Sequence, residues 1–457
     1  MQGPREEAPF SHTGPLPVLF QYRGDERQAP EREDRMQEKY VVEKSTLEGT
    51  VRASGAKNSA LKLMAAALMG GGPSTIHNVP DIADVRTMLE LLDYMGFSTS
   101  FAGGTVTVGP AVNPKTEAPY YLVQRMRASV DVLGALSARF GRARVAMPGG
   151  CNIGARQIDL HLKGLAQMGA DLQVSHGYVE VESNGLTGSH IYLEFASVGA
   201  TENLLMAACM AKGPSVLENV AKEPEIADLA VFLNEMGARI EGIGSSTLSV
   251  DGMSELSGAE HSVMGDRIEA GTYLIAGAAT GGAVKVEGVD PSTLEMLSMK
   301  MLEAGCEIES GEEGGGWMRA SSNGRPAGIE ISTLPYPGFA TDLQPQMLAL
   351  LSIGEGTSFI TENIFDNRFM VVDELNRLGT DITTKGHHAI VRGVEALSSA
   401  SVTSTDLRAG AALCIAGMLA DGATEVYEIQ HVDRGYERFE EKLSSLGAKI
   451  RREPVGA

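Results

Sequence analysis

The 457-residue chain is 43% hydrophobic and 21% charged, so it can bury one large core or two domain-sized cores. Its formal net charge of −21 argues against a general nucleic-acid or anionic-membrane surface, since phosphate neutralisation needs clustered Lys and Arg. No apolar run approaches the ~20 residues of a membrane span. Four widely separated cysteines without a C-x-x-C pair indicate neither a disulfide framework nor a zinc site, which fits a reducing cytoplasm.

Residues 1–37 are expected to form a disordered extension, because they are rich in Pro, Glu and Arg and lack the apolar segment of a signal peptide. Met36 is a candidate translation start, which N-terminal sequencing of the native protein would test. Residues 39–51 then read as a strand left over at the beginning of the chain. We expect this strand to complete the C-terminal half by cyclic closure.

The remaining chain repeats one pattern six times. An amphipathic helix ends in Gly at Gly96, Gly169, Gly237, Gly305, Gly379 and Gly447. An earlier helix in each repeat is apolar on all sides and is predicted over residues 57–70, 127–141, 201–213, 269–281, 343–354 and 407–422. Such inner helices should form a central bundle, with the amphipathic helices nearer the outside. Alternating segments predict strands at 74–79, 144–147, 215–220, 284–289, 357–364 and 425–432.

The order of these segments predicts an α/β protein of six βαβαββ units in two three-fold halves. We place a hinge in the Gly- and Ser-containing residues 253–265. The expected domains are residues 58–265 on one side, and residues 38–57 together with 266–457 on the other.

Polar and charged residues begin the inner helices: Lys57, Asn58, Arg127, Ser197, Asp266, Arg267, Asp342, Asp406 and Arg408. If these helix N-termini converge, their unpaired N–H groups and the basic side chains create an anion site. The alternative is that each Ser, Asp or Asn simply caps its helix. Capping does not explain the Lys and Arg residues.

The second repeat carries an insertion, Pro-Gly-Gly-Cys-Asn-Ile-Gly-Ala-Arg at residues 148–156. Cationic neighbours such as Arg156 would favour the thiolate form of Cys151, which makes it a candidate reactive residue. The alternative is that Cys151 is a small hydrophobic residue, as we expect for Cys209, Cys306 and Cys414. Equivalent loops carry Arg368 and Arg434, some of which could instead pair with nearby carboxylates.

The motifs SGAKN, MRAS, PGGCNIGAR, SVGAT, TDLQPQ, NRF, TDLRAG and DRGYER occur in this order between about residues 40 and 450. Together they closely resemble the UDP-N-acetylglucosamine 1-carboxyvinyltransferases, a family of enolpyruvyl transferases. The resemblance implies two inside-out α/β barrel domains with the active site in the cleft between them. It also implies enolpyruvyl transfer from phosphoenolpyruvate to the 3′-hydroxyl of UDP-N-acetylglucosamine, with release of phosphate. Neither a metal nor an organic cofactor is implied.

The resemblance assigns roles to individual residues. Cys151 is the expected acid and site of a covalent adduct, Asp342 is the expected base, and Lys57 and Arg434 complete the catalytic set. Phosphoenolpyruvate is expected to contact Lys57, Asn58, Arg156, Arg368, Arg408 and Arg434. The nucleotide sugar is expected to contact Asn58, Arg127, Arg156, Gln157, Ile158, Asp159, Leu160, Phe195, Ala196, Ser197, Val198, Asp342 and Ile364. Fosfomycin is expected to alkylate Cys151.

Two positions depart from the family pattern: Gln157, where Pro is common, and Asp366, where Glu usually precedes Asn-Arg-Phe. Two other readings stay open from the residues alone. A sister enzyme acting on shikimate 3-phosphate would share the architecture, although PGGCNIGAR argues against it. A non-catalytic repeat scaffold would leave Cys151 and the arginines without a role. An RNA 3′-phosphate cyclase is disfavoured by the acidic charge.

Overall fold

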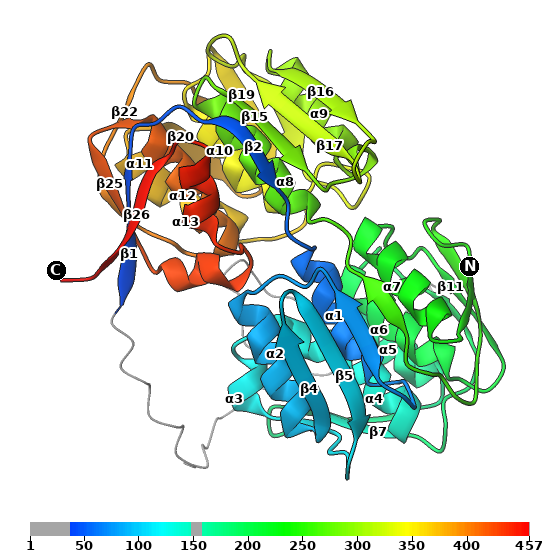
Figure 1. The fold of residues 1–457 in the computed structure, drawn as a ribbon. Coiled ribbons are helices and arrows are strands. Elements are labelled where there is room, and N and C mark those ends of the chain that lie inside the picture. Colours follow the sequence, from blue (N-terminus) through cyan, green and yellow to red (C-terminus); the bar gives the residue numbers. More distant parts are fainter. Residues whose placement is uncertain (1–36, 148–157, 457) are drawn as a thin grey trace, which may run out of the picture. The chain divides into compact units, whose positions relative to one another are not determined.

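The six predicted repeats are present in the computed structural model, which describes residues 37–147 and 158–456 (Figure 1). These residues belong to one compact unit, Met36–Ala457. Each repeat runs strand, inner helix, strand, outer helix and a closing pair of strands. The α/β class and the βαβαββ unit are therefore confirmed. The predicted extension at residues 1–37 lies, except for Gln37, outside the described residues.

The inner helices lie at the centre because almost every residue in them is apolar or small. They are α1 (Lys57–Ala67), α4 (Val132–Phe140), α6 (Val198–Cys209), α8 (Arg267–Ala279), α10 (Gln344–Ser352) and α12 (Leu407–Leu419). Every residue of α8 is buried. Helices α1, α4 and α6 pack together, and so do α8, α10 and α12, as predicted for helices without a polar face. Short 3₁₀ turns, η1 (Arg127–Asp131) and η3 (Thr341–Leu343), precede α4 and α10.

The outer helices all end in the predicted way. They are α2 (Ala83–Tyr94), α5 (Asp159–Gln167), α7 (Pro224–Glu235), α9 (Glu295–Glu303), α11 (Val371–Arg377) and α13 (Phe439–Ser445). The Gly that follows each helix has a positive φ, from 85° at Gly169 to 102° at Gly237. Glycine adopts this left-handed conformation without a steric penalty, which explains why it recurs there. The remaining short helices are α3 (Tyr120–Val123), η2 (Pro291–Leu294), η4 (Arg368–Met370) and η5 (Ile429–Arg434).

Three four-stranded sheets surround the first set of inner helices. The first has the order β14-β3-β5-β4 and comprises β14 (Glu260–Ser262), β3 (Ser74–His77), β5 (Thr105–Ala111) and β4 (Phe97–Ala102). The second comprises β6 (Glu117–Ala118), β7 (Arg142–Ala146), β9 (Tyr178–Glu182) and β8 (Asp171–Ser175). The third comprises β10 (His190–Tyr192), β11 (Pro214–Glu218), β13 (Thr247–Asp251) and β12 (Arg239–Glu241). In each sheet the first two strands are parallel and the others antiparallel.

The second set of inner helices has three sheets of the same kind. One comprises β2 (Glu48–Arg52), β15 (Ala283–Glu287), β17 (Trp317–Ser321) and β16 (Glu307–Gly311). The next comprises β18 (Glu330–Ser332), β19 (Thr357–Thr361), β21 (His388–Arg392) and β20 (Asp381–Lys385). The last comprises β23 (Ser401–Thr403), β25 (Ala423–Tyr427), β1 (Glu38–Glu43) and β26 (Lys449–Pro454). A separate short pair joins β22 (Leu397–Ser398) to β24 (Ala420–Asp421). Helices inside and sheets outside give the predicted inside-out arrangement. Hydrogen bonds between strands join the members of each sheet to one another.

The predicted cyclic closure is confirmed. Strand β1 lies between β25 and β26, with Tyr40 opposite Val426 on one side and Arg452 on the other, while β2 runs parallel to β15. Figure 1 shows β1 beside the C-terminal strand β26, and β2 farther along near β15. The first three sheets are closed in the same way by β14, which lies within the predicted hinge at 253–265. Part of that segment is therefore a strand rather than a linker.

The apolar residues form two separate cores. The first core, which we define by its cluster of buried side chains, runs from Ala56 to Val263. The second core combines Tyr40–Ala53 with residues 268–450. The proposed domain division at 58–265 follows the same partition and remains a prediction. Within the described residues, none of the helices has both the length and the apolar character needed to cross a membrane.

Candidate active site

Asp84 joins two of the predicted phosphate-binding cations. Lys57 begins α1 in the first core, Asp84 lies in the first turn of α2, and Arg434 ends η5 in the second core. The Lys57 Nζ atom lies 2.8 Å from Asp84 Oδ2, and Arg434 Nε donates a hydrogen bond to Asp84 Oδ1 at 2.9 Å. A single buried carboxylate thus brings together two cations from distant parts of the chain.

The charges in this cluster are unbalanced. Burial alone would raise the pKa of Asp84, but Lys57 and Arg434 outweigh burial and lower it, so the carboxylate is ionised. Burial lowers the pKa of Lys57; Asp84 opposes this effect, and Arg434 and Arg408 add to it. Two cations facing one carboxylate leave a positive charge that a phosphate group can neutralise. Sequence reasoning missed Asp84, because an acidic residue in a first helical turn is ordinarily just a favourable interaction with the helix dipole.

A second cluster joins the predicted base to both cations expected at a carboxylate. Arg368 Nη2 donates to Asp342 Oδ1 at 3.0 Å, and Arg408 donates to Asp342 Oδ2 through Nε at 3.1 Å and Nη2 at 3.0 Å. Arg368 and Arg408 are almost fully buried, and the Asp342 side chain is 25% exposed. The guanidinium of Arg408 also lies 5.2 Å from the ring centre of Tyr436. Asp342, Arg368 and Arg408, predicted separately, are therefore in direct contact.

Two nitrogen atoms of this cluster have no hydrogen-bond partner among the described residues: Arg368 Nε and Arg408 Nη1. An unsatisfied buried donor costs about 1–3 kcal/mol, so both nitrogens favour an added acceptor. Guanidinium groups recognise planar carboxylates through paired hydrogen bonds. The chemistry of this cluster thus suits a carboxylate, and which anion each of the two clusters binds remains a prediction.

Capping accounts for some of the polar helix starts, but not for all of them. Asp406 accepts hydrogen bonds from the backbone N–H groups of Arg408 and Ala409 at 2.9 and 3.1 Å, and Asp266 caps α8 in the same way. Ser197 Oγ accepts from Ala200 N at 3.4 Å. Asp342 makes no such cap, because its carboxylate faces two arginines instead. The alternative interpretation is thus correct for Asp406, Asp266 and Ser197.

The residues predicted to contact the nucleotide sugar lie near the starts of helices that pack on one another. Asn58 is exposed at the start of α1, Arg127 is half-buried at the start of η1, and residues 158–160 begin α5. Residues 195–198 lead into α6, which packs against both α5 and η1. Phe195 is 49% exposed, so its ring is accessible to a ligand. Ile364 follows β19 in the second core, and the contacts of all these residues with a sugar remain predictions.

Three predicted site residues lie outside the described residues: Cys151, Arg156 and Gln157. Met147 and Ile158 flank this part of the chain, and Ile158 is buried in the first core. Asp366, the other departure from the family pattern, is exposed.

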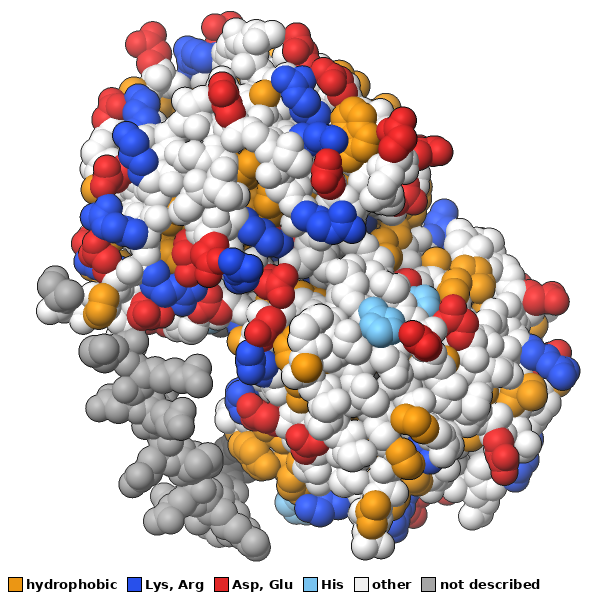
Figure 2. Space-filling model, in the orientation of Figure 1, with side chains coloured by type: hydrophobic (Ala, Val, Ile, Leu, Met, Phe, Trp, Pro, Cys, Tyr) orange, Lys and Arg blue, Asp and Glu red, His pale blue; other side chains and the backbone are white. Residues whose placement is uncertain are grey.

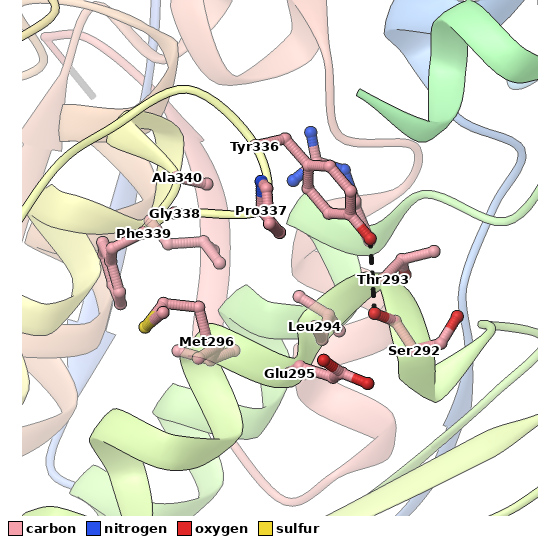
Figure 3. A pocket seen from close by; sticks show the side chains of 13 residues that line it. Ser292, Thr293, Leu294, Glu295, Met296, Tyr336, Pro337, Gly338, Phe339 and Ala340 are labelled. Atoms are coloured by element: carbon pink, nitrogen blue, oxygen red, sulfur yellow. Dashed lines mark hydrogen bonds between the residues drawn. The ribbon is translucent and has the colours of Figure 1, made fainter. Parts of the chain in front are cut away.

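A small pocket lies behind the loop that leads to Asp342 (Figure 3). Tyr336, Pro337 and Phe339 face η2 and the start of α9, and the Tyr336 hydroxyl donates to Ser292 O at 3.4 Å. The pocket holds about 20 Å³, which is room for one water molecule rather than a nucleotide.

The visible surface does not suggest a nucleic-acid partner. On the face shown in Figure 2, Lys and Arg side chains alternate with Asp and Glu side chains among the described residues. A mixed surface of this kind lacks the continuous basic stripe that binds a phosphate backbone.

The sequence matches the family of EPSP synthase (3-phosphoshikimate 1-carboxyvinyltransferase) over residues 41–443. UDP-N-acetylglucosamine 1-carboxyvinyltransferase 2 of Carboxydothermus hydrogenoformans is 52% identical over 416 residues, which cover 91% of this chain and 99% of that protein. UDP-N-acetylglucosamine 1-carboxyvinyltransferase of Myxococcus xanthus is 52% identical over 410 residues, covering 89% of this chain and 97% of that protein.

Solved structures support the same fold. The enolpyruvyl transferase NikO from Streptomyces tendae has a TM-score of 0.82 at 24% identity and covers 92% of this chain and 100% of that one. EPSP synthase from Acinetobacter baumannii has a TM-score of 0.71 at 19% identity and covers 91% of this chain and 100% of that one. Identities in this range establish the enolpyruvyl transferase fold alone. With the matches of about 50% identity over nearly the whole length, they show that this chain belongs to the UDP-N-acetylglucosamine 1-carboxyvinyltransferases of the EPSP synthase family.

Proposed function

We propose that the chain transfers the enolpyruvyl group of phosphoenolpyruvate to the 3′-hydroxyl of UDP-N-acetylglucosamine and releases phosphate. This is the first committed step of peptidoglycan precursor synthesis. The observation that carries the proposal is the pair of cation clusters, Lys57–Asp84–Arg434 and Arg368–Asp342–Arg408, each with two cations and one carboxylate. Phosphoenolpyruvate has one phosphate and one carboxylate, which matches two such clusters. The cytoplasm is the proposed location.

The proposed chemistry assigns a separate task to each group. The 3′-oxygen attacks C2 of the enol phosphate while C3 takes up a proton, which makes C2 electrophilic. Asp342 accepts the hydroxyl proton, and its contacts with Arg368 and Arg408 hold its carboxylate in place for this role. Cys151 is the proposed acid at C3 and can also form a covalent adduct at C2. The tetrahedral intermediate then loses phosphate from C2 and a proton from C3, which restores the C2–C3 double bond in the enolpyruvyl product. Lys57, Arg156 and Arg434 compensate the charge of the leaving phosphate.

The proposed substrates lie at the junction of the two cores. Lys57, Arg127 and residues 158–160 and 195–198 belong to the first core, whereas Asp342 and Arg434 belong to elements of the second. Because Asp84 already joins Lys57 to Arg434 across this junction, the phosphate would sit where the cores meet. Orientation of both substrates in one water-poor site can supply up to about 7–11 kcal/mol of the barrier reduction.

A phosphate-release assay tests the proposal. The purified chain is mixed with phosphoenolpyruvate and either UDP-N-acetylglucosamine or shikimate 3-phosphate, and free phosphate is followed. We expect phosphate release only when the acceptor is UDP-N-acetylglucosamine. Release with shikimate 3-phosphate would keep the fold and replace the substrate. No release with either acceptor would favour the scaffold interpretation.

The role of Cys151 has its own test. Fosfomycin is expected to add one covalent molecule to the wild-type chain, detectable by mass spectrometry, and to abolish turnover. The variant Cys151→Asp should retain part of the turnover, since a carboxylic acid can also donate a proton, and should lose sensitivity to fosfomycin. Equal sensitivity of both proteins would contradict the assignment of Cys151. Cys209→Ser, which changes a buried cysteine of α6, is the control and should remain sensitive.

A further inference from the structure

Glu362 is a buried carboxylate that no role described so far uses. It follows β19 directly, and its side chain is completely buried. Its Oε1 atom accepts hydrogen bonds from Thr333 Oγ1 at 2.8 Å, from Ile364 N at 2.8 Å and from Phe365 N at 3.1 Å. Its Oε2 atom accepts from Thr341 Oγ1 at 3.0 Å. One side chain therefore connects three separate segments of the second core.

Two of these segments carry proposed substrate contacts. Thr341 is the neighbour of Asp342 in η3, and Ile364 is a proposed contact of the nucleotide sugar. Glu362 holds the Ile364 backbone through one carboxylate oxygen and the Thr341 side chain through the other. Four hydrogen bonds converge on this one fully buried side chain, so the connection is stiff. The proposed base and the proposed sugar contact are thus fixed relative to each other.

Comparison of the repeats shows that the sheet itself does not need Glu362. In the first and third repeats, the residue after the central strand is Asn78 or Asn219. Each donates from Nδ2 to a backbone carbonyl just beyond the parallel edge strand, Val263 O or Leu193 O. In the fifth repeat, Asn363 makes the corresponding bond to Thr333 O at 3.1 Å. Glu362 is therefore an additional residue between the strand and the asparagine that secures the sheet.

We propose that Glu362 is a positioning residue for the transfer reaction. It sets the distance between the Asp342 carboxylate and the sugar-binding backbone at Ile364 by accepting hydrogen bonds from both loops. The inference rests on the proposed function, because Asp342 and Ile364 have to contact the acceptor sugar. Misplacement of a reacting group by about 1 Å can cost about a hundredfold in rate.

The test cuts the connection on its Asp342 side. Thr341→Val removes the hydroxyl that donates to Glu362 Oε2 and preserves the shape of the side chain. We expect kcat to fall by about tenfold to a hundredfold with an unchanged KM for phosphoenolpyruvate. Thr341→Ser keeps the hydroxyl and should restore kcat. Glu362→Gln should have a similar effect, and the double variant should be no slower than the slower single variant, because both changes break the same connection.

The matched control is Ser358→Ala on the same strand. Ser358 is buried and accepts a hydrogen bond from Ile329 N at 3.1 Å, at the end of β19 away from Glu362. It should lower the melting temperature without changing kcat. Equal loss of kcat in Ser358→Ala and Thr341→Val would overturn the inference, since the effect would then be general destabilisation.

Asp342→Asn separates failure of the inference from failure of the proposed function. If Asp342→Asn abolishes turnover while Thr341→Val and Glu362→Gln turn over normally, the positioning role is wrong and the proposed base stands. If Asp342→Asn turns over normally, the proposed role of Asp342 is wrong, and the role of Glu362 fails with it.

Discussion

Two buried charge clusters lie among the inner helices, and their charges balance differently. In the first core, Lys62 Nζ lies 2.8 Å from Asp131 Oδ2 and 2.7 Å from Glu202 Oε2. In the second core, Asp342 faces Arg368 and Arg408. The Lys62 cluster (Lys62, Asp131 and Glu202) has one cation and two carboxyl groups. The Asp342 cluster (Arg368, Asp342 and Arg408) has two cations and one carboxylate.

Protonation of one carboxyl group balances the charges of the Lys62 cluster. Burial raises the pKa of Glu202 to about 8, and the nearby Asp131 contributes, although Lys62 opposes the shift. Glu202 therefore carries a proton near neutral pH, and Lys62 pairs with Asp131. The two arginines of the Asp342 cluster outnumber the one carboxylate that they contact. Burial lowers the pKa of Arg408, but Tyr436, Asp342 and the nearby Asp266 outweigh burial and raise it. A charge cluster that is balanced internally stabilises the fold, whereas an unbalanced one is suited to bind an anion.

The largest effect on catalysis is expected from Arg408→Met, which would break the Arg368–Asp342–Arg408 cluster. Arg408 loses its contacts with Asp342 and with the carboxylate of phosphoenolpyruvate, and truncation of a buried charge pair typically costs about 2–5 kcal/mol. We expect kcat/KM for phosphoenolpyruvate to fall by at least about thirtyfold, as measured by steady-state kinetics. Arg408→Lys should recover little, because an ammonium cannot form the paired hydrogen bonds of a guanidinium. Normal kinetics in Arg408→Met would remove this cluster from the site.

Lys62→Met would break the Lys62 cluster and should lower stability rather than turnover. Removing the cation leaves Asp131 without its ionic partner in the core, and loss of one member of a buried pair costs about 3–5 kcal/mol of unfolding free energy. Denaturant titration measures this loss. Turnover of the folded fraction should not change, because Lys62 has no proposed contact with substrate. A variant with normal stability and impaired turnover would reverse the distinction between the clusters.

Per pH unit, the smallest effect is a pH dependence of stability that comes from Glu202. Its pKa is about 8 in the folded chain against 4.5 for an ordinary Glu, so folding takes up a proton between these values. The stabilisation is complete below pH about 4.5 and is lost as the pH rises through about 8, with a slope of at most about 1.4 kcal/mol per pH unit. Glu202→Gln, which is neutral throughout, should flatten this part of the profile. An identical slope in both proteins would assign the titration to another group.

The repeated parts of the fold could be predicted from the sequence because their causes are local. The positions of Gly96 and its five equivalents have a left-handed backbone, which favours glycine. The apolar composition of the inner helices predicts that they are buried. Cyclic closure was predictable because residues 39–51 had no partner within the first repeat. The predicted strands at 357–364 and 425–432 extend too far, since Glu362 turns the chain after β19 and η5 begins at Ile429.

The candidate site was only partly predictable for a different reason. Motifs identified Lys57, Asp342, Arg368, Arg408 and Arg434 as charged residues at helix starts and loops. The partners of charged residues depend on tertiary contacts. Arg434 lies 350 residues from its partner Asp84, and Lys62, outside the proposed site, lies 140 residues from Glu202. Nothing in the local sequence distinguishes Asp84 from any acidic residue in the first turn of a helix, or Glu362 from a strand residue. The arrangement of partners had to come from the structure.

The position of β1 has a consequence for how the chain acquires its structure on the ribosome. Lys39 in β1 pairs with Glu425 in β25, 386 residues later. At a synthesis rate of about 5–20 residues per second, β1 waits roughly 20–80 s before its neighbours emerge. The first core, which is continuous from Ala56 to Val263, can be completed during that interval. The first strand of the fold to leave the ribosome is thus among the last to find its partners, with both strand edges unpaired and exposed to chaperones in the meantime.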